Sequence, residues 1–251
     1  MRVRYIPSGD VDLIKDFLRR GFPVMMPTWH IDGDGSQMGH YRLIHGFDDS
    51  NARFDIRDSL EPAGYAMDYA AFDALWRVFN RRMLVVFPPH RSEDVEEIAG
   101  PLGSETHILE RSLEIASRET VPPRPLPPGM SEGQYRAYAD FNRAMALTAL
   151  GRDEEAAAFV RSAFERGLPW RMLWYQPEVL AAMFAVGEHA WIISRTSAAL
   201  APYPYLEELW YWQGRAELES GRPGRAAEAF RRAVEIRPDW DAAMDELARL
   251  E

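Results

Sequence analysis

The chain has 251 residues, of which 47% are hydrophobic and 27% are charged, as in an ordinary globular protein. Its net charge of −10 argues against non-specific binding to nucleic acid or to an anionic membrane surface. No stretch approaches the roughly 20 apolar residues that cross a bilayer, so no membrane insertion is expected, and the cytoplasm is the default location. Because no cysteine is present, this chain offers no disulfide, thiolate metal site or thiol nucleophile.

Residues 1–90 predict an α+β domain built around a small, mostly antiparallel sheet. Apolar residues recur at helical spacing in two segments, and apolar or alternating runs bounded by turn residues mark four strands. The expected elements are helices over Val11–Arg20 and Tyr69–Asn80, and strands over Pro23–Trp29, Tyr41–Phe47, Arg53–Asp58 and Met83–Phe87.

The candidate catalytic residues of this domain are His40 and Asp58. His40 precedes one predicted strand and Asp58 ends its hairpin partner, so closure of the hairpin brings the two side chains together. A carboxylate that accepts a hydrogen bond from one imidazole nitrogen leaves the other nitrogen to act as a general base. The pair therefore has the form of the base and orienter of a Cys-His-Asp site.

Five segments carry a longer pattern around this pair: GFPV (21–24), GHYRLIHGFDD (39–49), Asp58-Ser59, AFDALWRVFN (71–80) and LVVFPP (84–89). With these segments, residues 10–89 resemble the second lobe of the papain-like cysteine peptidases related to bacteriocin-leader processing enzymes. The resemblance covers about a third of the chain and implies a papain-like half-domain. It also implies that His40 is the catalytic base and that Asp58 orients it.

The departure from that family is the missing nucleophile. In the family, a cysteine opens a helix upstream of the histidine and follows an oxyanion-hole glutamine, whereas this chain has no cysteine. Both groups are expected on a first lobe that this sequence lacks. The chain alone is therefore expected to be inactive. In the alternative interpretation it is the C-terminal part of an active peptidase.

Other histidines in this half admit simpler interpretations. His45 is interpreted as core or edge packing. His30, His40 and His45, with Asp32 and Asp34, match no metal-loop spacing, so no metal is expected. No glycine-rich phosphate loop is present either, so no cofactor is expected.

The middle of the chain predicts a connection between two domains. Helices are expected over Ser92–Ala99 and Glu105–Ser117 within a connecting region, 91–120, where they would cap a helical array. Val121–Gly129 contains five prolines in nine residues, so the linker 121–130 is expected to be extended.

Residues 131–251 contain a repeating pattern that begins at three glycines. Gly151, Gly187 and Gly221 are 36 and 34 residues apart. Small or apolar residues and a helix-ending position recur after each glycine: Ala156, Ala163 and Leu168; Ile192, Ala199 and Pro204; Ala226, Ala233 and Pro238. This period predicts stacked helical hairpins with turns at the three glycines.

The third copy resembles a tetratricopeptide repeat, because seven residues fall on that spacing: Trp210, Gly214, Gly221, Ala226, Phe230, Ala233 and Pro238. The resemblance implies an all-α solenoid whose surface binds a peptide or protein partner. The aromatic segment Arg166–Glu178 is interpreted mainly as a wedge between repeats, with a partner-binding role left open. Two function classes remain: a binding module with an inactive peptidase-like companion, or the C-terminal piece of an enzyme.

Overall fold

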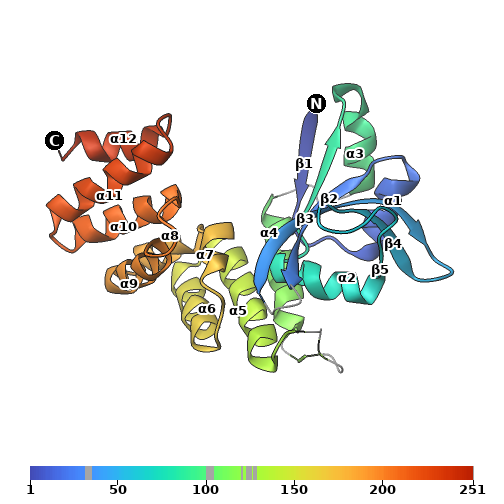
Figure 1. The fold of residues 1–251 in the computed structure, drawn as a ribbon, viewed down its shortest axis with the longest axis horizontal. Coiled ribbons are helices and arrows are strands. Elements are labelled where there is room, and N and C mark those ends of the chain that lie inside the picture. The colour runs from blue at the N-terminus through green and yellow to red at the C-terminus, as the bar shows by residue number, and fades with distance from the viewer. Residues whose placement is uncertain (32–35, 100–104, 120, 123–125, 127–128, 251) are drawn as a thin grey trace. The chain divides into compact units, whose positions relative to one another are not determined.

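The computed structural model describes residues 1–31, 36–99, 105–119, 121–122, 126 and 129–250 (Figure 1). The chain divides into two compact units, Met1–Ala146 and Leu147–Glu251. This division lies inside helix α5 (Glu132–Ala149), whereas the boundary expected from the sequence lay in the proline-rich segment 121–130. Residues 123–125 and 127–128 of that segment lie outside the described part.

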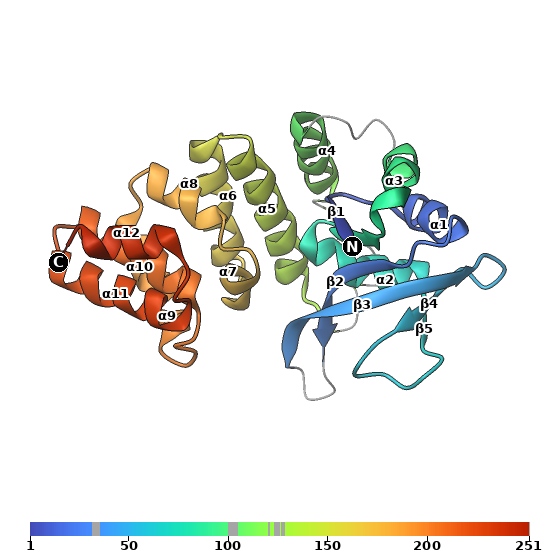
Figure 2. The same cartoon turned by 90° about the horizontal axis from the view of Figure 1, so that it is seen from above.

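The first unit contains a six-stranded antiparallel sheet in the order β1-β6-β2-β3-β4-β5. Figure 2 shows β3 beside β4 in this sheet. The expected small antiparallel sheet is therefore present, with two more strands than the sequence indicated. The strands are β1 (Arg2–Ile6), β2 (Val24–Ile31), β3 (Gln37–Asp48), β4 (Arg53–Arg57), β5 (Ala66–Asp68) and β6 (Met83–Phe87). The unexpected strands, β1 and β5, form the two edges of the sheet. β5 has only three residues, and β1 leaves most of its residues exposed, so neither gives a clear strand signal in the sequence.

Helices α1 (Val11–Arg19), α2 (Tyr69–Trp76) and α3 (Ser92–Ala99) pack against the same face of this sheet. Alternate strand residues such as Met26, Ile44 and Ile56 point to that face and join the helices in one core. The α-helix predicted to reach Asn80 ends earlier, at Trp76, and continues as the 3₁₀ turn Arg77–Phe79. A further helix, α4 (Glu105–Arg118), follows α3 in the chain.

An ion cluster connects the end of the sheet core to the following helices. Glu119 pairs with Arg77 at 3.0 Å and with Arg81 at 2.5 Å, and Arg81 also pairs with Asp73 at 2.6 Å. The Arg77 guanidinium lies 3.6 Å from the ring centroid of Tyr135 in α5. Burial lowers the pKa of Arg81, but the hydrogen bonds that Arg81 donates to Asp73 and the negative charge of the nearby Glu119 outweigh it, so the pKa lies above its ordinary value.

The described residues beyond position 131 are helical, with no strand among them. The elements that follow α5 are α6 (Asp153–Glu165), α7 (Arg171–Tyr175), α8 (Val179–Ala185), α9 (His189–Leu200), α10 (Glu207–Glu219), α11 (Pro223–Ile236) and α12 (Asp241–Ala248). In the second unit, α8 packs on α9, α9 on α10 and α10 on α11 (Figure 1). No described helix is both long and apolar enough to cross a membrane.

The three repeat glycines lie between helices, as the spacing predicts. Gly151, Gly187 and Gly221 separate α5 from α6, α8 from α9 and α10 from α11, with φ of 70°, 77° and 74°. Such left-handed backbone at the end of a helix favours glycine. At Gly221 the turn is closed by N–H groups of Gly221 and Arg222, which donate to Leu218 and Glu217 carbonyls at 2.9 and 3.0 Å.

The small residues of the pattern are buried where helices approach. Ala156, Ala199, Ala226 and Ala233 are all 0% exposed. A Cβ atom added to Gly214 would lie only 2.8 Å from the Phe230 ring, so glycine is required for the contact between α10 and α11. The aromatic segment before α8 is less buried than expected, since Trp174 is 45% exposed and Met172 and Leu173 provide the packing.

Candidate functional site

The pairing of β3 with β4 contains a β-bulge. Phe47 lies opposite Phe54, whereas Ile44 lies opposite Ile56, so β3 has one more residue than β4 between these pairs. Both pairs nevertheless point into the core. Ile44 and Phe47 are three residues apart, and the bulge takes up the extra residue so that both side chains lie on the same face. His45 lies at the bulge and is exposed, which corrects its interpretation as a packing residue.

The bulge decides on which face Asp58 lies. Continuing the pairing one step past Leu43 and Arg57 puts Asp58 opposite Arg42. Without the extra residue, Asp58 would lie opposite Leu43, whose side chain points to the other face of the sheet. His40 is two residues from Arg42 on β3, so it shares that face and lies diagonally across from Asp58.

The structure brings the two predicted site residues into contact. Nε2 of His40 lies 2.7 Å from Oδ1 of Asp58. The His40 side chain is 14% exposed and that of Asp58 is 0% exposed. The backbone N–H of Leu60 donates to the same Oδ1 at 2.8 Å. Because an ionised carboxylate only accepts hydrogen bonds, the proton of this contact is on Nε2 of His40.

Arg42 joins this pair to two residues of β2. Its Nε lies 2.8 Å from Oδ2 of Asp58 as an ion pair, though without hydrogen-bond alignment. Its Nη1 donates to Oγ1 of Thr28, and its Nη2 donates to Nδ1 of His30 at 3.1 Å. Thr28 in turn donates to the carbonyl of His40 at 3.0 Å. We call these five residues the histidine cluster.

The surroundings keep the Asp58 carboxylate ionised. Burial alone raises the pKa of Asp58, because it disfavours the charged form. The hydrogen bonds from Leu60 and His40 and the positive charge of Arg42 act in the opposite direction and together outweigh burial. The pKa of Asp58 therefore lies below its ordinary value, which suits a carboxylate that accepts a hydrogen bond from the imidazole.

Arg42 and Thr28 are the cluster residues that the sequence interpretation missed. The signal for Arg42 was the period of two along a strand, since residues 40 and 42 share a face. The signal for Thr28 is weaker, because its pairing opposite His40 depends on the register of β2 against β3. Chemically, the cluster can accept a proton at His40, while the chain itself has no cysteine to serve as nucleophile.

The histidines do not form a metal-binding group in the described part of the chain. The rings of His30 and His40 are 5.7 Å apart between centroids, but His45 lies away from them at the bulge. Asp32 and Asp34 lie outside the described residues. Within the described residues, no three His, Asp or Glu side chains gather closely enough to hold a metal ion.

The helical unit has a second feature of interest, an arginine held by aromatic rings. Arg215 of α10 lies 4.2 Å from the ring centroid of Phe184 and 5.1 Å from that of Trp212. Arg195 lies similarly over Trp191, at 5.6 Å. No carboxylate among the described residues pairs with either arginine. Half-buried aromatic rings with arginine are the composition of protein-binding hot spots.

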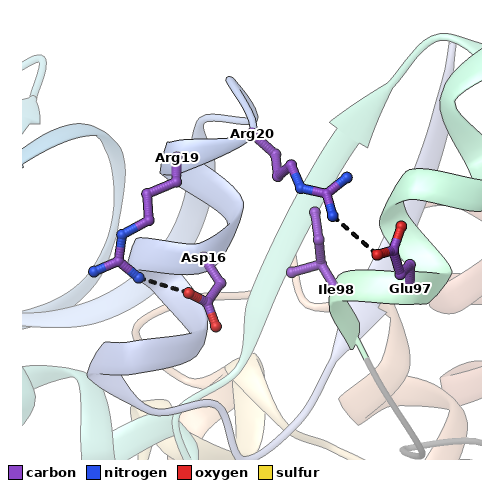
Figure 3. A pocket seen from close by; sticks show the side chains of 5 residues that line it. All are labelled: Asp16, Arg19, Arg20, Glu97 and Ile98. Carbon is purple, nitrogen blue, oxygen red and sulfur yellow. Dashed lines mark hydrogen bonds and ion pairs between the residues drawn. The ribbon is translucent and has the colours of Figure 1, made fainter.

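A pocket of about 270 Å³ lies between α1 and α3 (Figure 3). Its lining consists of Asp16, Arg19, Arg20, Glu97 and Ile98. Arg19 pairs with Asp16 at 2.6 Å, and Arg20 pairs with Glu97 at 2.9 Å. Because these charges neutralise one another, the pocket presents no unbalanced charge to a ligand.

The tetratricopeptide repeat family matches residues 207–240. This range contains α10 and α11, so the strongest of the repeats expected from the spacing is confirmed. The match does not extend to residues 10–89, and the resemblance of that segment to a peptidase lobe stays a prediction from the sequence. No curated protein matches the chain.

Proposed function

We propose that the chain is a protein-binding module whose helical repeats hold a peptide or protein partner. The observation that carries this proposal is the tetratricopeptide repeat match over residues 207–240, which coincides with the α10–α11 hairpin. Such repeats present extended surfaces to partners because each hairpin contacts only its neighbours. The aromatic setting of Arg215 supplies a candidate anchor on that surface.

The test begins with selection of peptides that bind the full chain from a displayed library of random sequences. The selected peptide is then titrated against the unmodified chain and two variants. Arg215→Ala should weaken binding at least about tenfold, or 1.4 kcal/mol. The matched control, Arg225→Ala, alters an exposed arginine of α11 and should leave the affinity unchanged. Equal affinity of all three proteins would remove Arg215 from the binding surface, and failure to select any peptide would count against the module.

A second candidate function is favoured by the contact between His40 and Asp58. We propose that these residues are the base and orienter of a papain-like peptidase site whose nucleophile this chain does not supply. Its support is the 2.7 Å contact at the two positions that the family resemblance assigns to these roles. The lone pair on Nδ1 of His40 is the group that would accept a thiol proton.

An assay with a fluorogenic protein substrate tests this second candidate. The purified chain should release no fluorescence above background, because it has no cysteine. Treatment with a thiol-alkylating reagent should likewise change nothing. Cleavage by the unmodified chain that disappears in His40→Ala would contradict the claim that the chain is inert.

A further inference from the structure

We infer that Arg42 is a positioning residue, which balances the charge of Asp58 so that Nδ1 of His40 stays free of a proton. This inference rests on the base and orienter roles proposed for His40 and Asp58. It assigns Arg42 a part in the site that neither the family resemblance nor the sequence pattern gave it.

The geometry of Arg42 supports a fixed position for its charge. The side chain is 2% exposed, Nη1 and Nη2 donate hydrogen bonds to Thr28 and His30, and Nε lies 2.8 Å from Oδ2 of Asp58 as an ion pair. Because a guanidinium has no acceptor, Nδ1 of His30 must receive the hydrogen bond. His30 is therefore held with its Nδ1 unprotonated and adds no positive charge through that atom.

The charge of Arg42 matters because a lone carboxylate has two effects on a histidine. It orients the ring, but it also favours the imidazolium, in which both nitrogens carry protons. An imidazolium has no lone pair and cannot act as a base. The guanidinium, which stays charged at any accessible pH, lies 2.8 Å from Oδ2 of Asp58, while Oδ1 accepts from His40. Asp58 thus keeps its orienting hydrogen bond while its charge is balanced.

The unprotonated Nδ1 is also the atom that a thiol would need. A cysteine thiol placed against Nδ1 would pass its proton to that nitrogen. The S–H bond would break, an N–H bond would form, and the electron pair would remain on sulfur as a thiolate. The new negative charge would face the balanced Arg42–Asp58 pair instead of an uncompensated carboxylate.

Nitrogen NMR of the full chain, labelled with ¹⁵N in its histidine rings, measures the protonation of Nδ1 directly. The His40 signal is the one that disappears in His40→Gln. At neutral pH the unmodified chain should show Nε2 protonated and Nδ1 unprotonated. Arg42→Gln should shift His40 toward the doubly protonated ring, whereas Arg42→Lys, which keeps the charge, should not. The control Arg57→Gln, an exposed arginine next to Asp58, should change nothing.

The double variant Arg42→Gln/Asp58→Asn separates charge balance from packing. It removes both charges and keeps a carbonyl oxygen that accepts a hydrogen bond from Nε2, so Nδ1 should again be unprotonated. Loss of the free Nδ1 in Arg42→Lys would overturn the inference even if Arg42→Gln does not fold. An unchanged signal in folded Arg42→Gln would overturn it as well. A proton on Nδ1 and none on Nε2 in the unmodified chain would instead remove the base and orienter roles themselves.

Discussion

The two units of this protein reach their structures through contacts of different range. In the helical unit, helices pack on others close by in the sequence, as α10 does on α9 and α11 and as α6 does on α8. In the α+β unit, the histidine cluster joins residues 12, 14 and 18 positions apart on three segments of chain. Local packing leaves a periodic trace in the sequence, whereas the cluster depends on strand register.

The two units should lose stability to different kinds of substitution. In the helical unit, small residues at close approaches limit the volume that a substitution can add. In the histidine cluster, the Asp58 carboxylate is the charge that pairs with the buried guanidinium of Arg42, so its removal leaves that guanidinium without compensation. The largest effects of substitution are therefore expected in the cluster.

Substitution of Asp58 should have the largest effect. Asp58→Ala leaves the guanidinium of Arg42 buried without its carboxylate, so we expect a loss of about 3–5 kcal/mol in the free energy of unfolding. Urea denaturation followed by circular dichroism measures this loss. The control is Asp55→Ala, which alters a half-exposed residue of β4, the strand that Asp58 directly follows. It should cost much less unfolding free energy. Similar losses of unfolding free energy in both variants would show that the Arg42–Asp58 ion pair contributes no more to stability than an exposed carboxylate does.

The sequence predicted the helical unit better than the site. The spacing of the glycines and alanines predicts the turns at Gly151, Gly187 and Gly221, because each repeat is a local unit. The contact of His40 with Asp58 was expected from closure of the hairpin, but it is the β-bulge that puts both side chains on one face. Arg42 was missed because its pairing with Asp58 follows from the β-bulge, and alternation along a strand does not show where an extra residue lies.

In the helical unit, an enlarged side chain at a close approach should have a smaller effect. Ala233 is 0% exposed in α11, so Ala233→Leu should overpack the helix contact and cost about 1–3 kcal/mol. The exposed Ala242 of α12 gives the control, Ala242→Leu, which should be close to neutral. Thermal unfolding of both variants provides the comparison. Equal midpoints would mean that the helix contact at Ala233 can absorb a larger side chain.

The stability contributed by Asp58 should depend on pH in one direction. Its pKa is lower in the folded protein than the ordinary value of about 3.9, so its contribution is fully present above that value. As the pH falls through the folded pKa, protonation removes the contribution. The difference in unfolding free energy between the unmodified chain and Asp58→Asn should therefore shrink between about pH 5 and pH 3. A difference that grows as the pH falls would contradict the lowered pKa.

Two glycines of the helical hairpin should respond to alanine in opposite directions. At Gly214, the added Cβ would lie 2.8 Å from the Phe230 ring, so overpacking outweighs the gain in helix propensity. At Gly224, near the start of α11, no atom lies within 4 Å of the added Cβ, and the backbone has no positive φ. Gly224→Ala should therefore stabilise the protein, by up to about 1 kcal/mol, because alanine loses less backbone entropy in a helix. If the denaturation midpoints of both variants move in the same direction, the close contact between α10 and α11 at Gly214 does not require glycine.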